Sequence, residues 1–108
     1  MPSHLGEFEQ LVLLALLRLD DQAYGVAVHR EITRRTGRRT SYGTVYATLA
    51  RLEAKGFVTA RMGEPTAERG GRRKRFFTLL APGRRALERS LRNVARMTQG
   101  IDASWELP

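Results

Sequence analysis

The spacing of apolar residues predicts helices in the first half of the chain. Residues 5–19 contain no proline and only one glycine, and the stretch from Leu11 to Leu17 is apolar on every side of a helix. Such a helix must be covered all round. Its own domain could cover it entirely, as in an ordinary central core helix, or a second subunit could cover one side. Both interpretations fit the pattern.

Two more helices are expected before residue 57. Asp20 and Asp21 offer an N-cap for a second helix, which keeps helical spacing up to Thr36-Gly37. A third helix is predicted from the N-cap Ser41 to Gly56, which suits the left-handed position after a helix end. Its larger apolar side chains share one sector of the helix, which we expect to pack on the first two helices: Tyr42, Val45, Tyr46, Leu49 and Leu52. Its alanines form a second strip, which we expect to pack closely: Ala47, Ala50 and Ala54.

After residue 56 the pattern changes to that of strands. Residues 57–62 and 74–79 predict a β-hairpin with a long tip between them. Pro82-Gly83 then opens a last helix with an apolar seam of heptad-like spacing and arginines on another face. The seam could lie on its own domain, but its place late in the chain favours a dimer contact. The residues expected at the dimer interface are Leu13, Leu16, Leu87, Leu91 and Val94.

The order of these elements predicts a mainly α fold with one small β-hairpin. Three helices followed by a hairpin with a basic tip are the layout of a winged helix-turn-helix, in which the third helix enters the DNA major groove. We therefore expect a DNA-binding domain over residues 1–80 and a dimerisation helix over residues 81–101. Residues 102–108, including Trp105, show no period and are expected to be a disordered tail.

Charge gives an independent indication of the partner. The chain has 108 residues, enough for one domain with one core, and a net charge of +8. The net charge is −3 over residues 1–21, +9 over residues 22–75 and +2 over residues 76–108, so the middle of the chain carries the positive charge. A charge concentrated in this way points to a polyanion such as nucleic acid, although a solvated basic face is the simpler alternative.

One side of the third helix carries polar groups that can contact DNA. Hydroxyls and basic groups along one side of a helix can bond to base edges and phosphate oxygens. The residues predicted to contact DNA from this helix are Ser41, Tyr42, Thr44, Thr48, Arg51 and Lys55. Those predicted to contact the backbone from the preceding turn and the hairpin are Arg38, Arg39, Arg69, Arg72, Arg73 and Lys74.

The sequence resembles the PadR family of bacterial transcriptional regulators from about Leu5 to Leu91. The resemblance rests on four stretches: Leu11 to Leu17, Tyr24-Gly25, Gly43-Thr44-Val45-Tyr46 with Leu49, Leu52-Glu53 and Gly56, and Gly71-Arg72 with Lys74, Phe77-Thr78-Leu79 and Gly83. It departs from the family pattern at Ala47, where a proline is common, and at Leu80, where a threonine usually caps the last helix. The resemblance implies a dimeric repressor on an inverted-repeat operator, and some relatives respond to small-molecule effectors.

Other functions find less support in the sequence. The chain has two histidines and no cysteine, and it lacks metal-ligand spacing and a phosphate-binding loop, so we expect neither an enzyme nor a metal or other cofactor. No segment predicts a membrane span or a signal peptide, so a cytoplasmic protein is expected. A basic protein that binds RNA or the ribosome stays an alternative, as does a module whose arginine-rich last helix binds an acidic protein.

Overall fold

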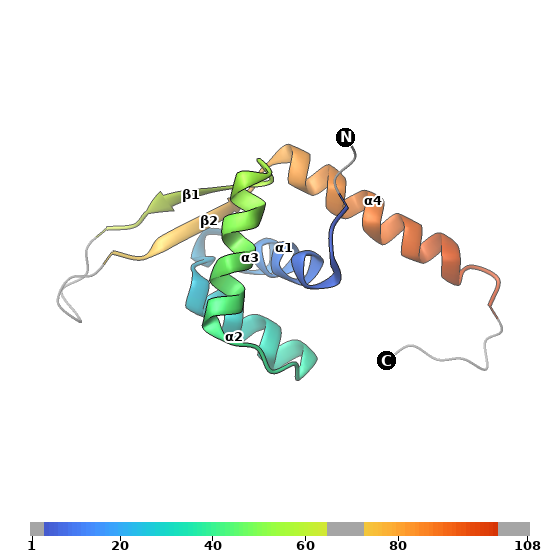
Figure 1. The fold of residues 1–108 in the computed structure, drawn as a ribbon, viewed down its shortest axis with the longest axis horizontal. Helices are drawn as coiled ribbons and strands as arrows, with labels where there is room; N and C mark the ends of the chain where they lie inside the picture. The colour runs from blue at the N-terminus through green and yellow to red at the C-terminus, as the bar shows by residue number, and fades with distance from the viewer. Residues whose placement is uncertain (1–3, 65–72, 102–108) are drawn as a thin grey trace.

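The computed structural model describes residues 4–64 and 73–101, which form a small helical domain with a hairpin and a projecting last helix (Figure 1). The elements follow in the order α1 (Glu7–Leu19), the short 3-10 helix η1 (Asp20–Gln22), α2 (Gly25–Thr36), α3 (Tyr42–Ala54), β1 (Val58–Met62), β2 (Arg75–Leu79) and α4 (Ala81–Thr98). The predicted fold class is therefore confirmed. None of the helices in the described ranges has both the length and the apolar character that a membrane crossing requires.

The core lies where α1, α2 and α3 meet the hairpin. The fully buried side chains from the three helices include Val12, Leu13, Val28, Val45, Leu49 and Leu52. Burying a side chain of this size stabilises a fold by about 1.5 to 3 kcal/mol. Because three of these residues lie on α3, the core fixes how α3 is rotated about its own axis and therefore which of its side chains face outward.

The helix boundaries follow largely from local sequence signals. Ser41 caps α3 as predicted, and its side-chain oxygen accepts a hydrogen bond from the backbone N–H of Thr44 at 3.0 Å. Gly37 and Gly56 take positive φ values of 71° and 76° directly after the ends of α2 and α3, where glycine has no Cβ to strain. The predicted cap of the second helix was wrong: Asp20 and Asp21 form η1, and α2 begins later, after Tyr24.

The hairpin is antiparallel, with Thr59 opposite Thr78 and Arg61 opposite Phe76. It is also tied to the helical domain through β2. The backbone N–H of Phe77 donates to the carbonyl of Ala23, and Tyr24 forms an isolated bridge with Phe76, so the segment before α2 pairs with β2. This pairing fixes the base of the β1–β2 hairpin, which we call the wing, against the start of α2.

Helix α4 leaves the domain after its first turns. Gly83, Ala86 and Leu87 are buried against the domain, whereas every residue from Leu91 to Met97 is exposed (Figure 1). Its N-cap Leu80 makes no side-chain cap bond, and Pro82 lies in the first turn, as the sequence indicated. The helix ends at Thr98 rather than at the predicted residue 101.

Gly83 should be needed where α4 meets the hairpin. A Cβ at Gly83 would overlap the carbonyl oxygen of Phe57 and lie 2.8 Å from Cδ1 of Leu79. We expect Gly83→Ala to lower the free energy of unfolding by about 1 to 3 kcal/mol, because backbone cannot yield easily to the added methyl. Gly43→Ala is the matched control, since its Cβ meets only Ser41 Oγ at 3.7 Å and should stabilise α3. Urea unfolding of both variants tests the prediction, and equal shifts would contradict it.

Candidate nucleic-acid interface

Helix α3 exposes a face of mostly small residues. The exposed positions are Tyr42, Gly43, Thr44, Tyr46, Ala47, Ala50, Arg51 and Ala54, which we call the outward face. The predicted close packing of Ala47, Ala50 and Ala54 is therefore wrong. Tyr42 and Tyr46 are 51% and 47% exposed, but one side of each ring packs on α2 as predicted, against His29 and Gly25. The core takes only the narrower sector of Val45, Leu49 and Leu52, which turns the alanines toward solvent.

The predicted polar stripe of α3 is only partly exposed. Thr48 is completely buried, and its hydroxyl donates to the carbonyl of Thr44 at 2.8 Å, so its placement on an exposed stripe was wrong. Ser41 and Thr44 are exposed at the start of the helix, where unpaired backbone N–H groups favour a phosphate. Tyr42 is also exposed, and its ring lies against His29 with the centroids 4.1 Å apart. The N-terminal end of the predicted stripe therefore faces solvent.

Arg51 and Lys55 are both held by Glu9, a residue that the sequence analysis did not identify. Lys55 Nζ lies 2.9 Å from Oε2 of Glu9, and Arg51 Nε lies 3.9 Å from the same oxygen. Burial raises the pKa of Glu9, but hydrogen bonds from Lys55 and the Gly6 N–H outweigh burial and hold the pKa below its ordinary value. The only local signal for this role was the spacing of a capping box, with Glu9 three residues after the N-cap Gly6.

The residues predicted to contact the DNA backbone differ in their exposure and in whether they already form an ion pair. Arg38 pairs with Glu7 at 2.7 Å, whereas Arg39 is exposed beside it in the turn before α3. Arg73 and Lys74 are exposed where the chain enters β2, and Lys74 lies over the ring of Tyr24. Arg69 and Arg72 lie outside the described residues.

Arg61 is a further wing cation that the sequence analysis missed. Its guanidinium carbon lies 4.7 Å from the ring centroid of Phe76, its cross-strand partner. On the other strand, Arg75 bonds to both carboxylate oxygens of Glu53 on α3, at 3.1 and 3.0 Å. Both bonds come from the same nitrogen, Nη2, and the pair joins the wing to α3, so the two elements lie side by side (Figure 1).

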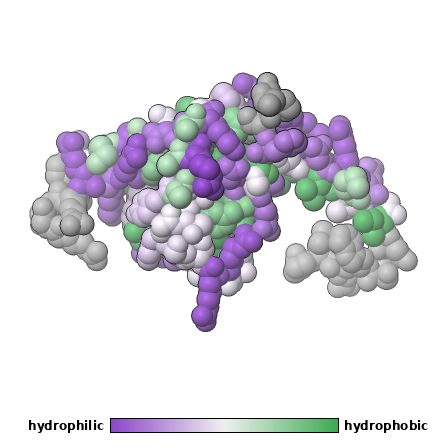
Figure 2. All heavy atoms as spheres, in the orientation of Figure 1, coloured by the Kyte–Doolittle hydropathy of each residue, from purple (hydrophilic) through white to green (hydrophobic). Residues whose placement is uncertain are grey.

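The apolar residues expected at a dimer interface are only partly available. Leu13, Leu16 and Leu87 are 0%, 3% and 2% exposed because the chain's own core covers them, so their assignment to an interface was wrong. Leu91 and Val94 are exposed, together with two apolar residues outside the original set, Met97 and Ile101. In Figure 2, apolar residues gather on one side of the projecting α4 and hydrophilic residues cover the other.

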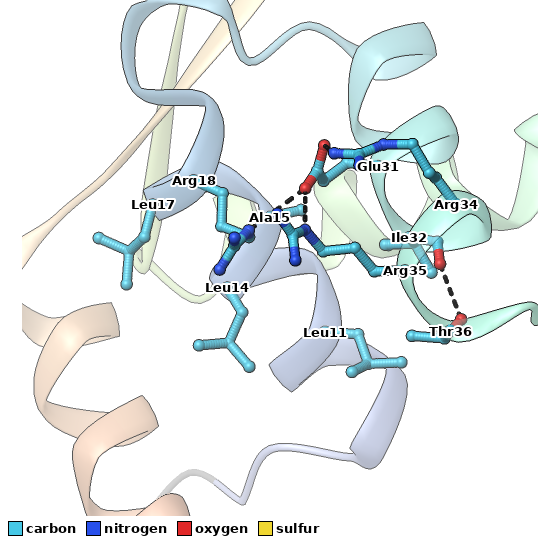
Figure 3. A pocket seen from close by; sticks show the side chains of 10 residues that line it. All are labelled: Leu11, Leu14, Ala15, Leu17, Arg18, Glu31, Ile32, Arg34, Arg35 and Thr36. Atoms are coloured by element: carbon cyan, nitrogen blue, oxygen red, sulfur yellow. Dashed lines mark hydrogen bonds and ion pairs between the residues drawn. The ribbon is translucent and has the colours of Figure 1, made fainter. Parts of the chain in front are cut away.

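A hollow of about 650 Å³ lies between α1 and α2. Leu11, Leu14 and Leu17 of α1 line one side of it (Figure 3). Arg18, Arg34 and Arg35 converge on Glu31 at its edge, and hydrogen bonds from Arg35 and Arg34 lower the pKa of Glu31 to about 2. Helix α1 therefore has one apolar side in the core and another that the described residues leave partly uncovered.

Comparison with known proteins fits this architecture. The model of the PadR-like family of transcriptional regulators matches residues 13–89, which run from the middle of α1 through the wing to the first half of α4. The chain belongs to this family. The helix-turn-helix layout places its recognition helix in the DNA major groove, so α3, the helix before the wing, is the candidate DNA-reading helix of this PadR-like chain.

Individual relatives of this PadR-like chain agree with its assignment. It is 25% identical to a solved PadR family regulator from Clostridium difficile, with a TM-score of 0.65 over 86% of this chain and 95% of that one. It is also similar, at 25% identity and a TM-score of 0.65, to part of the Aeropyrum pernix ORC1 protein solved in complex with DNA, covering 86% of this chain and 26% of that one.

One curated relative is more similar in sequence but much longer. It is an uncharacterised 37.1 kDa protein in transposon Tn4556 of Streptomyces fradiae, 39% identical over 93 residues. The match covers 86% of this chain, and the chain spans about a quarter, 24%, of the length of that relative.

Proposed function

We propose that this PadR-like protein is a dimeric, cytoplasmic repressor that binds an inverted-repeat operator through the outward face of α3. The observation that carries the proposal is the rotation of α3. Its core residues turn Thr44 and Arg51 outward on either side of Ala47, with no bulky side chain between them. Such a face can approach base edges closely, and a small apolar side chain suits a thymine methyl.

The surroundings of α3 supply contacts for the phosphate backbone. Arg39 precedes the helix, and Arg61, Arg73 and Lys74 lie on the wing beside it. Aromatic rings support two of these cations, since Phe76 lies under Arg61 and Tyr24 under Lys74. Cations on both sides of a helix would fix its depth and register in the groove without reading sequence.

The dimer rests on apolar surface that a single chain leaves exposed. Met97 is 78% exposed and Val94 57%, on a half of α4 that none of the residues described by the structure covers. A short helical segment that packs against nothing is only marginally stable in water. A second copy would cover it together with Leu14 and Leu17 of α1, and a twofold arrangement would place two α3 helices for two half-sites.

A small-molecule effector fits the same surface. The hollow between α1 and α2 offers an apolar wall of leucines and a rim of arginines, and it lies on the side of α1 that the dimer would cover. A ligand bound there would change the spacing of the two α3 helices.

Selection of DNA duplexes from a random library tests the proposal. We expect enrichment of an inverted repeat with two equal halves, and binding to the DNA upstream of the protein's own gene. A structured RNA of equal length should compete only weakly, because the deep and narrow major groove of an RNA helix cannot admit α3. No enriched sequence, with RNA binding as tight as DNA binding, would contradict a repressor and favour the RNA-binding alternative.

A further inference from the structure

We propose that Glu9 is a positioning residue of the DNA interface, which holds Lys55 away from the phosphate backbone and orients Arg51, and so limits binding to DNA of unrelated sequence. The inference deepens the proposed function and rests on it. The carboxylate of Glu9 on α1 pairs with Arg51, in the C-terminal half of α3, and with Lys55, the residue that follows this helix.

The two oxygens of Glu9 have different tasks. Oε1 accepts a hydrogen bond from the backbone N–H of Gly6 at 2.8 Å, which holds the carboxylate at the start of α1. Oε2 faces α3, 2.9 Å from Lys55 Nζ. The side chain of Glu9 is only 9% exposed, so its geometry is fixed by packing rather than chosen freely in solvent.

Arg51 is oriented from two sides. Its Nη2 donates to the hydroxyl of the buried Thr48 at 3.1 Å, and its Nε faces Glu9 at 3.9 Å. The side chain is nevertheless 56% exposed, so the rest of the guanidinium faces outward. A planar fork held along one edge keeps its remaining donors in a fixed direction, which suits bidentate contact with a guanine.

Lys55 is held more tightly than a phosphate-binding lysine needs to be. Its side chain is 32% exposed, and its ammonium group lies against Glu9 and within 3.5 Å of the carbonyl of His4. Glu9, Arg51 and Lys55 together therefore present one net positive charge at this end of α3 instead of two. Fewer free cations mean weaker attraction to DNA of any sequence and a larger share of affinity from base contacts.

Glu9→Gln tests the role, because the amide oxygen can still accept from Gly6 while the negative charge is lost. We expect the affinity for a random duplex to rise by about 3- to 10-fold at low salt, and the slope of log affinity against log salt to steepen by about 0.9, as one more phosphate contact forms. The preference for the selected operator over random DNA should fall. Glu88→Gln is the control, since it changes the net charge equally at an exposed α4 position that pairs with no charge within residues 4–64 and 73–101.

Lys55 variants make the test specific. In the Glu9→Gln background, Lys55→Gln should return the salt slope to the wild-type value, because the released lysine is the new contact. The double variant restores the wild-type sum of one positive charge, since only Arg51 stays charged at this end of α3. Equal effects of Glu9→Gln and Glu88→Gln, or a steeper slope that persists in the double variant, would overturn the proposal. All slopes are measured on random DNA with the full chain, so they stand even if no operator is found and the repressor function fails.

Discussion

Leu91→Glu should convert the proposed dimer into a monomer. Leu91 is 42% exposed on the single chain and lies in the apolar seam of α4 with Val94, and the exposed Ile101 follows the end of the helix. A carboxylate buried there without a partner would cost several kcal/mol, enough to raise the dimer dissociation constant by about 100-fold or more. Operator affinity should fall with it, because each half-site would then be bound by one domain alone.

Sedimentation of the variant and the wild type at equal concentration checks this expectation. Asn93→Glu is the matched control: it adds the same charge two residues away, at an exposed position on the other side of α4. We expect the control to stay dimeric. A dimer that withstands Leu91→Glu would remove the α4 seam from the interface, even if another surface holds the subunits together.

Arg51→Ala should weaken binding to the selected operator by about 1 to 3 kcal/mol, the typical value of one good bidentate base contact. The reason is the fixed direction of the guanidinium between Thr48 and Glu9. Binding to a random duplex should change much less. Fluorescence anisotropy with both duplexes at one salt concentration measures the difference.

Arg73→Ala provides the comparison for Arg51→Ala. Arg73 is exposed where the chain enters the wing, so we expect its loss to weaken operator and random DNA alike and to lower the salt slope by about 1. If Arg51→Ala behaved in the same way, Arg51 would be a phosphate contact and not a base-reading residue.

The fold could be predicted well from sequence because its signals are local. Ser41 and Gly56 mark the ends of α3 by side-chain chemistry and by a φ of 76° that favours glycine, and both signals act within one helical turn. The start of α2 was missed for the opposite reason. Asp20 and Asp21 look like caps locally, but pairing of Tyr24 with Phe76, more than fifty residues later, decides where α2 begins.

The candidate site was harder to predict because burial is decided by tertiary packing. A helical wheel grouped Tyr42 and Tyr46 with the core leucines, yet both rings lie at the edge of the packed sector and emerge into solvent. Thr48 looked polar and therefore exposed, but its hydroxyl is satisfied inside the helix by the carbonyl of Thr44, which allows complete burial. Glu9 could not be linked to Lys55 without knowing how α1 crosses α3.

A cleavage experiment tests most directly whether α3 lies in the major groove. The chain has no cysteine, so Ala50→Cys on the outward face and Ala95→Cys on the exposed part of α4 each create a single thiol for an iron–EDTA label. We expect the label at position 50 to cut the operator inside each half-site, and the label at position 95 to leave both half-sites intact. Equal cutting from both positions, or none from position 50 on a duplex that is fully bound, would contradict the assignment of α3 as the DNA-reading helix.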